Sequence, residues 1–211
     1  MERTGVWGGR TTEERRADRR DRMLSVAIDI WSQHGWAAVT MRRVCAEAAL
    51  SDRYFYKEFG DRDGLLTAVW QHIEGEVLAT VAVAYAEKSG PGTSWEDLTR
   101  TATRVLVDHI VSHPAQAKIL LSRNEGSPIL ESERQRSFHR AIDLVTSAAR
   151  PRLRQGVDEL ALRMDAIVGV GGFVELLREW QSDAIAVDCD RIVDYVAEMA
   201  TRVGGQYRLP H

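Results

Sequence analysis

The sequence predicts an all-α protein of about nine helices, because apolar residues recur three and four positions apart along its whole length. No segment alternates apolar and polar residues over the length of a strand, and Gly- or Pro-containing breaks separate stretches of helical length. The 211 residues are 44% hydrophobic and 28% charged, which is typical of a globular protein that buries its own core.

The first predicted helix ends near Gly35, since glycine readily adopts the left-handed conformation that follows a helix. Its apolar stripe consists of Leu24, Ala27, Ile28 and Trp31. The second helix is short, and Thr40 is placed to cap its first turn. Its stripe consists of Met41, Val44, Cys45 and Ala48.

A third, aromatic helix follows the turn 49–51 and runs from about Asp52 to Glu58, with Ser51 as its cap. A long helix from about Arg62 to Glu87 comes next, capped by Asp61 or Asp63. Further helices are predicted at about 94–112, 114–123, 130–149, 157–181 and 188–203, with a tail after Gly204. These elements divide into an N-terminal three-helix domain, 1–62, and a C-terminal domain, 63–211.

Charge is distributed unevenly along the chain, whose net charge is −3. The first 62 residues have an excess of two positive charges, whereas the remainder has an excess of five negative ones. Arginines crowd the start, at Arg3, Arg10, Arg15, Arg16, Arg19, Arg20 and Arg22. Such an arm can neutralise phosphates, but acidic residues interleave with it, so a solvated helix start remains the alternative.

The compartment is predicted to be the cytoplasm. No run of apolar residues is long enough to cross a membrane, and the basic start lacks the apolar core of a secretory signal. Cys45 and Cys189 lie far apart within helical patterns, so each is expected to be a buried free thiol.

Residues 40–59 have the outline of a helix-turn-helix, in which the second short helix enters the major groove of DNA. Arg53 could pair with a guanine, while Phe55 and Phe59 are expected to be buried beneath the helix. The predicted DNA-binding residues are Thr40, Arg42, Arg43, Ser51, Asp52, Arg53, Tyr54, Tyr56, Lys57 and Arg62. The alternative is an ordinary polar and aromatic surface on a three-helix cluster.

From about Arg19 to Val77 the chain resembles the N-terminal domain of the tetracycline-repressor (TetR) family of bacterial transcriptional regulators. The segment MLSVAIDIWSQHGWAAVTMRRVCAEAALSDRYFYKEFGDRDGLLTAVW carries the resemblance. It implies a homodimer that binds a palindromic operator. Thr40, Tyr56 and Arg62 match the usual backbone contacts, and Ser51 to Tyr54 with Lys57 match the recognition helix.

Three positions depart from the family pattern. Ala49 stands where the turn usually has glycine, and a left-handed alanine costs on the order of 1 kcal/mol. Arg53 stands where the family usually has a small residue, and a large cation there can change the contacts with the bases. The operator sequence therefore cannot be inferred from relatives. Arg62 replaces lysine and keeps its positive charge.

The resemblance implies that residues 63–211 dimerise through the last two long helices and enclose a ligand pocket. Gly169, Gly171 and Gly172 lie within a predicted helix and would permit close approach of a partner, or else weaken a helix inside the monomer core. The predicted dimer residues are Met164, Val168, Gly171, Leu177, Ile192, Val196, Met199 and Val203.

A small-molecule pocket is predicted among the middle helices, from Trp70, Tyr85, Trp95, His109, Arg123 and Phe138, although residues of these types are more often plain core or surface. His109 and His113 share one helical face, but two histidines are a weak metal signal, so no metal and no cofactor is expected.

The function predicted from these features is a DNA-binding regulator, with a small-molecule effector that releases a repressor by tilting the helix 62–87. Activator and repressor use the same parts, so the choice between them stays open. The rival classes are a dimeric adaptor without DNA binding and a helical-bundle enzyme. The sequence lacks the Glu-x-x-His pair that a di-iron bundle needs, so we expect no enzyme.

Overall fold

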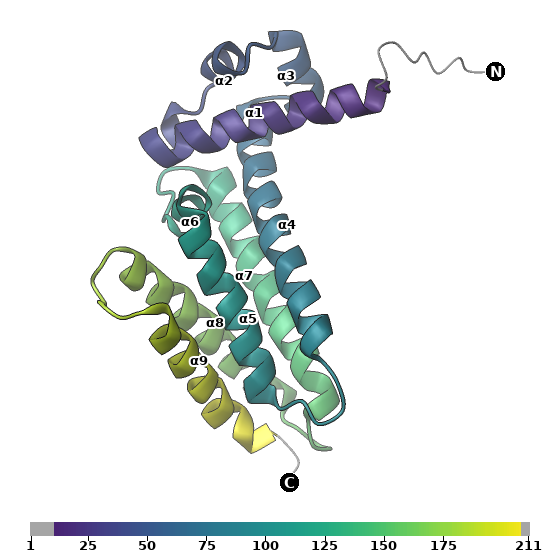
Figure 1. Cartoon of the computed structure of the whole chain (residues 1–211), viewed down its shortest axis with the longest axis vertical. Helices are drawn as coiled ribbons and strands as arrows, with labels where there is room; N and C mark the ends of the chain where they lie inside the picture. The colour runs from purple at the N-terminus through teal and green to yellow at the C-terminus, as the bar shows by residue number, and fades with distance from the viewer. Residues whose placement is uncertain (1–10, 208–211) are drawn as a thin grey trace, which may run out of the picture.

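The computed structural model describes residues 11–207, and every regular element in that range is helical (Figure 1). The α-helices are α1 (Thr12–His34), α2 (Met41–Ala48), α3 (Asp52–Phe59), α4 (Arg62–Lys88), α5 (Trp95–Ser112), α6 (Pro114–Leu121), α7 (Pro128–Ala149), α8 (Glu159–Gln181) and α9 (Cys189–Gly204). Three short 3-10 helices are η1 (Trp36–Ala38), η2 (Arg150–Arg152) and η3 (Gly205–Tyr207). The all-α prediction is therefore confirmed.

Helix α1 begins earlier than its apolar stripe suggests, at Thr12. The Thr11 hydroxyl accepts from the backbone N–H of Glu14 at 3.1 Å, and the Glu14 carboxylate accepts from the backbone N–H of Thr11 at 2.6 Å. This reciprocal pair is a capping box, whose Thr-x-x-Glu spacing was available in the sequence. Much of the arginine-rich start is thus helix, while Arg3 and Arg10 lie outside the described residues.

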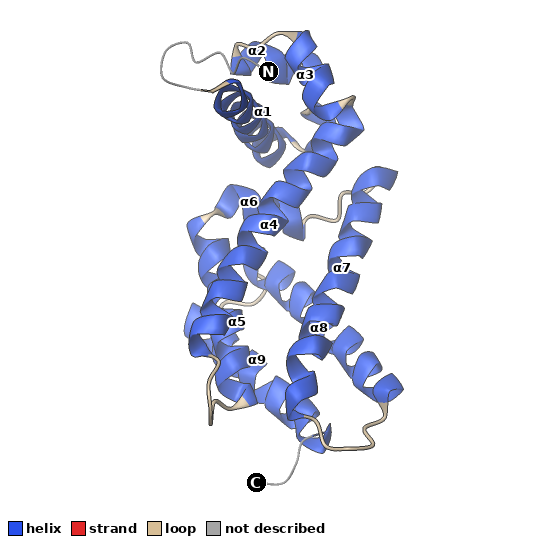
Figure 2. Cartoon of the chain, turned by 90° about the vertical axis from the view of Figure 1, so that its right-hand side faces the viewer, coloured by secondary structure: helices blue, strands red, loops and turns tan. Residues whose placement is uncertain are grey.

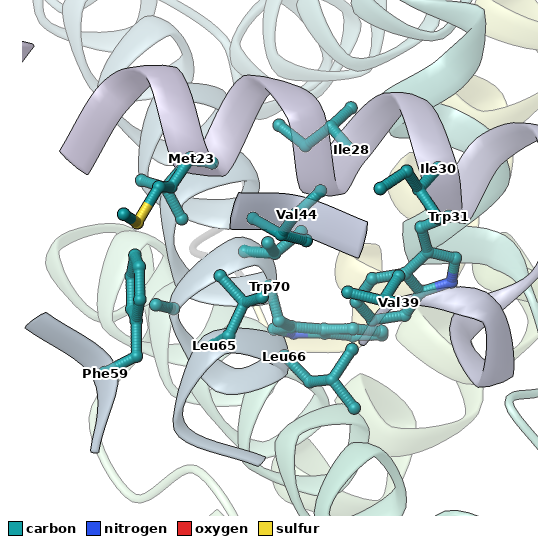
Figure 3. Close-up of a cluster of buried hydrophobic side chains, with 14 of the residues drawn as sticks. Met23, Ile28, Ile30, Trp31, Val39, Val44, Phe59, Leu65, Leu66 and Trp70 are labelled. Carbon is teal, nitrogen blue, oxygen red and sulfur yellow. The ribbon is translucent and has the colours of Figure 1, made fainter. Parts of the chain in front are cut away.

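The largest core joins α1, α2, α3 and the first turns of α4. Figure 3 shows Trp70 and Leu66 of α4 beneath Val44 and Trp31. Ile119 of α6 and Leu130 of α7 are fully buried in the same cluster. One continuous core therefore extends across the boundary predicted at residue 62. Helix α4 contributes side chains that pack both on the N-terminal helices and on α6 and α7.

The other helices form an elongated bundle below α1, which runs across its upper end (Figures 1 and 2). Helix α5 packs along both α4 and α9, and α7 packs along α4 and α8. A second, smaller core lies between α5, α8 and α9 and consists of Val107, Leu177, Ile192, Val193 and Val196.

This second core corrects part of the predicted dimer interface. Leu177, Ile192 and Val196 are at most 7% exposed within one chain, so they have no surface left for a partner. Helical periodicity reveals that a face is apolar, but it does not reveal which element covers that face. Met164, Val168 and Val203 are instead exposed.

The predicted tail after Gly204 is also corrected as far as it is described. Tyr207 is buried, and its phenol donates to Asp165 Oδ2 on α8 at 2.5 Å. This hydrogen bond to a carboxylate raises the pKa of Tyr207 to about 12. The backbone N–H of Arg154 donates to the Tyr207 carbonyl at 2.9 Å, so η3 is attached to the bundle.

No helix between residues 11 and 207 combines the length and the apolar character that a membrane span requires. Within the same range, no three His, Cys, Asp or Glu side chains are grouped so that they could hold a metal ion.

Candidate nucleic-acid interface

Helices α2 and α3 are joined by a tight turn that depends on Ala49. The Thr40 hydroxyl caps α2 by accepting from the backbone N–H of Arg43 at 3.3 Å. Ala49 then adopts φ 51° and ψ 45°, and the N–H of Leu50 returns to the Cys45 carbonyl at 3.0 Å. The left-handed alanine expected from the sequence is confirmed, and it directs α3 away from α2 as a helix-turn-helix requires.

The inner side of α3 holds the helix on the core. Phe55 is fully buried and Phe59 is 8% exposed, as the sequence predicts. Their ring centroids lie 5.5 Å apart, and both belong to the N-terminal core. Because these two side chains lie one turn apart, they fix which face of α3 remains outside.

The outer side of α3 is polar, and only its Tyr54 ring is partly covered, by Arg19 of α1. It carries Ser51, Asp52, Arg53, Tyr54, Tyr56 and Lys57, all of them exposed. Ser51 occupies the predicted N-cap position, but its hydroxyl makes no capping bond and stays available. An exposed face with a guanidinium, an ammonium, hydroxyls and a carboxylate can bond both base edges and phosphates.

Helix α2 adds cations beside this face. Thr40 and Arg42 are exposed, and Arg42 makes no side-chain ion pair within residues 11–207. Arg43 Nε instead bonds Glu47 Oε1 at 2.8 Å, one turn further along the helix. The charge of Arg43 is thus partly compensated, whereas that of Arg42 is not.

Arg62 has an internal role that the sequence did not reveal. Its Nε donates to the Val39 carbonyl at 2.7 Å, and its Nη2 donates to the Trp36 carbonyl at 2.8 Å. These bonds attach the α1–α2 connection to the first turn of α4. A phosphate contact by Arg62 stays a prediction, and two of its guanidinium nitrogens are already bonded within the chain.

Three arginines of α1 also contact α3, which sequence reasoning missed. Arg16 bonds Glu58, the Arg19 guanidinium lies over the Tyr54 ring, and the Arg20 guanidinium lies over the Phe59 ring. The capping box at Thr11 was the signal that could have placed these arginines on a single helix face.

The two cysteines are free thiols, as expected. Cys45 is buried, and the pKa of its thiol is raised by burial and by the neighbouring Asp52 carboxylate. A protonated thiol is a poor nucleophile, so Cys45 acts as a small core residue. Cys189 is only half-buried, at the start of α9.

The six residues predicted to line a pocket do not meet in one place. Trp70 is a core residue whose indole N–H donates to Ser137 at 2.8 Å. Tyr85 lies fifteen positions further along α4, a separation of roughly 22 Å. Arg123 is exposed and pairs with Glu175 at 3.1 Å. The pocket prediction is corrected accordingly, since no single cavity can include all six.

The remaining candidates are half-buried at separate positions. Trp95 opens α5, His109 stacks on His113 with ring centroids 4.5 Å apart, and Phe138 faces Gly171 across the α7–α8 contact. A shallow hollow of about 320 Å³ includes Arg123 and Glu131 at the α6–α7 loop. It is an open surface depression and encloses none of the other five predicted residues.

Comparisons with known proteins agree with this geometry. The family model described as "Bacterial regulatory proteins, tetR family" matches residues 23–69, which include the whole of α2 and α3. An uncharacterized HTH-type transcriptional regulator of Mycobacterium tuberculosis is 25% identical over 195 residues, covering 90% of this chain and 79% of that protein. The HTH-type transcriptional repressor NicS of Pseudomonas putida is 28% identical over 109 residues, covering 51% of this chain and 50% of that one.

A solved TetR-like transcriptional regulator from Rhodococcus sp. RHA1 has the same fold, with a TM-score of 0.64 and 25% identity over 88% of this chain and 95% of that chain. The fold and the exposed recognition face define a helix-turn-helix transcriptional regulator that binds DNA. Within the chain, the match to the TetR family itself covers residues 23–69, which hold the helix-turn-helix.

Proposed function

We propose that the protein is a homodimeric repressor that binds a palindromic operator and is released from it by a small-molecule effector. The observation that carries the proposal is the outer face of α3, whose polar and aromatic side chains are exposed while Phe55 and Phe59 hold the helix in place. In a DNA-binding regulator, the exposed side of the second helix of a helix-turn-helix is the natural surface for the major groove.

Within this proposal the contacts divide by chemistry. Thr40, Arg42, Arg43, Tyr56 and Arg62 bind phosphates, which sets the register of the protein on the duplex. Ser51, Asp52, Arg53, Tyr54 and Lys57 face the base edges, where the guanidinium of Arg53 can bond guanine through two N–H groups.

The partner of the chain is proposed to be a second copy, joined through α8. The exposed fraction of Leu160 is 67%, that of Met164 51% and that of Val168 73%. Ile167 is 40% exposed between them, so these four apolar side chains form a ridge along one helix. Apolar groups so exposed on one ridge mark an interaction surface. A two-fold axis through this ridge would place a second copy of α3 on the dimer, so that each recognition helix binds one half of a palindromic operator.

One glycine of α8 supports a close helix contact. Gly172 follows Val168 by four positions, and a Cβ built on it would meet no side chain or neighbouring helix within 4 Å among the described residues, so it leaves space beside the ridge. Gly171 differs, because its Cβ would lie 3.7 Å from Phe138 of the same chain. We assign Gly171 to packing within the protomer and Gly172 to the interface with the partner, whereas Gly169 lies on the side of α8 away from the ridge.

Repression and release are proposed to operate through α4. Its first turns belong to the core of the DNA-binding region, and its later turns pack on α5 and α7. An effector that favours one tilt of α4 would change the separation of the two recognition helices, which must be about 34 Å for one duplex turn. The repressor role is supported by NicS, which is a repressor. We infer that the protein works in the cytoplasm, where bacterial DNA lies.

Selection of bound duplexes from a random pool tests this function directly. The proposal expects an inverted repeat, and a reporter gene placed behind it should be silenced when the full-length protein is expressed. Recovery of no preferred sequence, or activation of the reporter, would contradict the proposal as stated.

A further inference from the structure

A carboxylate lies buried under the recognition helix. The side chain of Glu58 is only 5% exposed, although Glu58 immediately follows Lys57 on α3. Arg16 Nε of α1 donates to Glu58 Oε1 at 2.7 Å. Glu58 Oε2 is buried and accepts no hydrogen bond within the described residues. A buried carboxylate without a cation is costly, so Glu58 depends on Arg16.

The neighbouring turns of α1 reinforce this contact. The Arg19 guanidinium lies 4.4 Å from the centroid of the Tyr54 ring, and the Arg20 guanidinium lies 5.1 Å from that of Phe59. Arg16, Arg19 and Arg20 are spaced so that they share one side of the helix. Since α1 is anchored in the core by Met23 and Leu24, these contacts fix the rotation of α3 about its own axis.

We propose that Arg16 is a positioning residue for DNA binding, which orients the recognition helix through its ion pair with the buried carboxylate of Glu58. The inference rests on the proposed role of α3 as the recognition helix. The charge of Arg16 is compensated by Glu58, so Arg16 is not assigned to a phosphate. It contributes to sequence selectivity by holding α3 in the orientation in which its outer side chains reach the bases. The hydrogen bond to Glu58 also raises the pKa of the Arg16 guanidinium.

The same helix supplies matched controls. Arg15 and Arg22 are arginines of α1 whose side chains make no hydrogen bond or ion pair within residues 11–207. Loss of either removes one positive charge from the same helix but leaves the α1–α3 contact intact. A purely electrostatic role of α1 predicts equal effects for Arg15, Arg16 and Arg22, whereas positioning predicts an effect for Arg16 alone.

The experiment uses the full-length protein, a duplex that the wild type selects from a random pool, and a scrambled duplex of equal length. Affinity for both is measured over a salt series. Arg16→Gln should lower the ratio of specific to scrambled affinity by about tenfold, the effect of one lost base contact. Arg15→Gln and Arg22→Gln should leave that ratio unchanged, even if each lowers the salt slope by about one unit.

A second substitution tests the mechanism. In the Arg16→Gln background, Glu58→Gln removes the unpaired charge and should recover most of the lost ratio, because a neutral amide needs no counterion. Faster hydrogen exchange in α3 than in α2 should accompany Arg16→Gln and disappear in the double variant. If Arg16→Gln does not fold, Arg16→Lys replaces it and should lose a smaller part of the ratio.

Three results overturn the proposal. They are an unchanged ratio in Arg16→Gln, an equal loss in Arg15→Gln, and no recovery on adding Glu58→Gln. These results are distinguishable from a failure of the proposed function. If the protein does not bind a specific operator, the wild type itself selects no preferred duplex, and the positioning role of Arg16 is then also wrong.

Discussion

The guanidinium of Arg62 lies over the indole ring of Trp36, 5.1 Å from its centroid, and also donates to the Trp36 carbonyl. The ring extends toward the α6–α7 loop, where a Cβ added to Gly126 would lie 3.8 Å from it. Trp36 therefore lies between the start of α4 on one side and the α6–α7 loop on the other.

We predict that Arg62→Ala lowers the free energy of unfolding by about 1–3 kcal/mol, because two charged hydrogen bonds and a cation–π contact are lost. Chemical denaturation measures this, with the exposed Arg42→Ala as a control that should change little. Arg62→Lys keeps the charge but cannot donate to both carbonyls in the same geometry. Wild-type stability in Arg62→Lys would show that the internal bonds contribute nothing.

The left-handed conformation of Ala49 predicts a substitution that raises stability instead of lowering it. Ala49→Gly removes the steric cost of φ 51° and should raise stability by up to about 1 kcal/mol. The exposed Ala46 lies within α2, so Ala46→Gly should instead lower stability by about 1 kcal/mol. Thermal unfolding of the two variants compares them, and equal shifts of either sign would refute the strain argument.

The ridge on α8 predicts the oligomeric state. Val168→Glu places a charge at the proposed two-fold interface, where it would face its own copy, and should convert the dimer into monomers. Val111 is 57% exposed on α5, so Val111→Glu is a matched control that should remain dimeric. Light scattering of the purified proteins determines the mass, and a dimer that survives Val168→Glu excludes this interface.

The corner between α5 and α6 predicts a pH dependence. Burial lowers the pKa of His109, and the nearby His113 lowers it further, while Gln116 and Glu76 act against them. The unfolded chain therefore binds a proton more readily than the fold does, so this contribution to stability is present above about pH 6.5 and is lost as the pH falls. His109→Gln should flatten stability curves measured by denaturation between pH 5 and 8; curves that keep the wild-type slope would contradict this.

The helices and the buried side of α3 could be predicted because they depend on local periodicity. Phe55 and Phe59 are buried and Ala49 is left-handed, as their positions in the pattern indicate. Both properties follow from neighbours within one or two turns, which the sequence shows directly.

Longer-range contacts could not be predicted in this way. The apolar face of α9 is covered by α5 of the same chain, and Trp70 is a core residue that donates to Ser137, sixty-seven positions away. Arg16 and Glu58 are forty-two positions apart. Spacing along one helix shows that a face needs a partner or that a charge needs a counterion, but the partner is set by how the helices pack.

Selection of bound duplexes by the wild type and by Arg53→Ala in parallel tests whether α3 is the recognition helix of a dimer. The wild type should recover an inverted repeat with half-sites one helical turn apart, about 10 base pairs from centre to centre. Arg53→Ala should relax the preference at one position in each half-site while the remaining positions persist. Identical sequence preferences in the two proteins, or a recovered site without two-fold symmetry, would contradict the assignment of α3 as the recognition helix of a dimer.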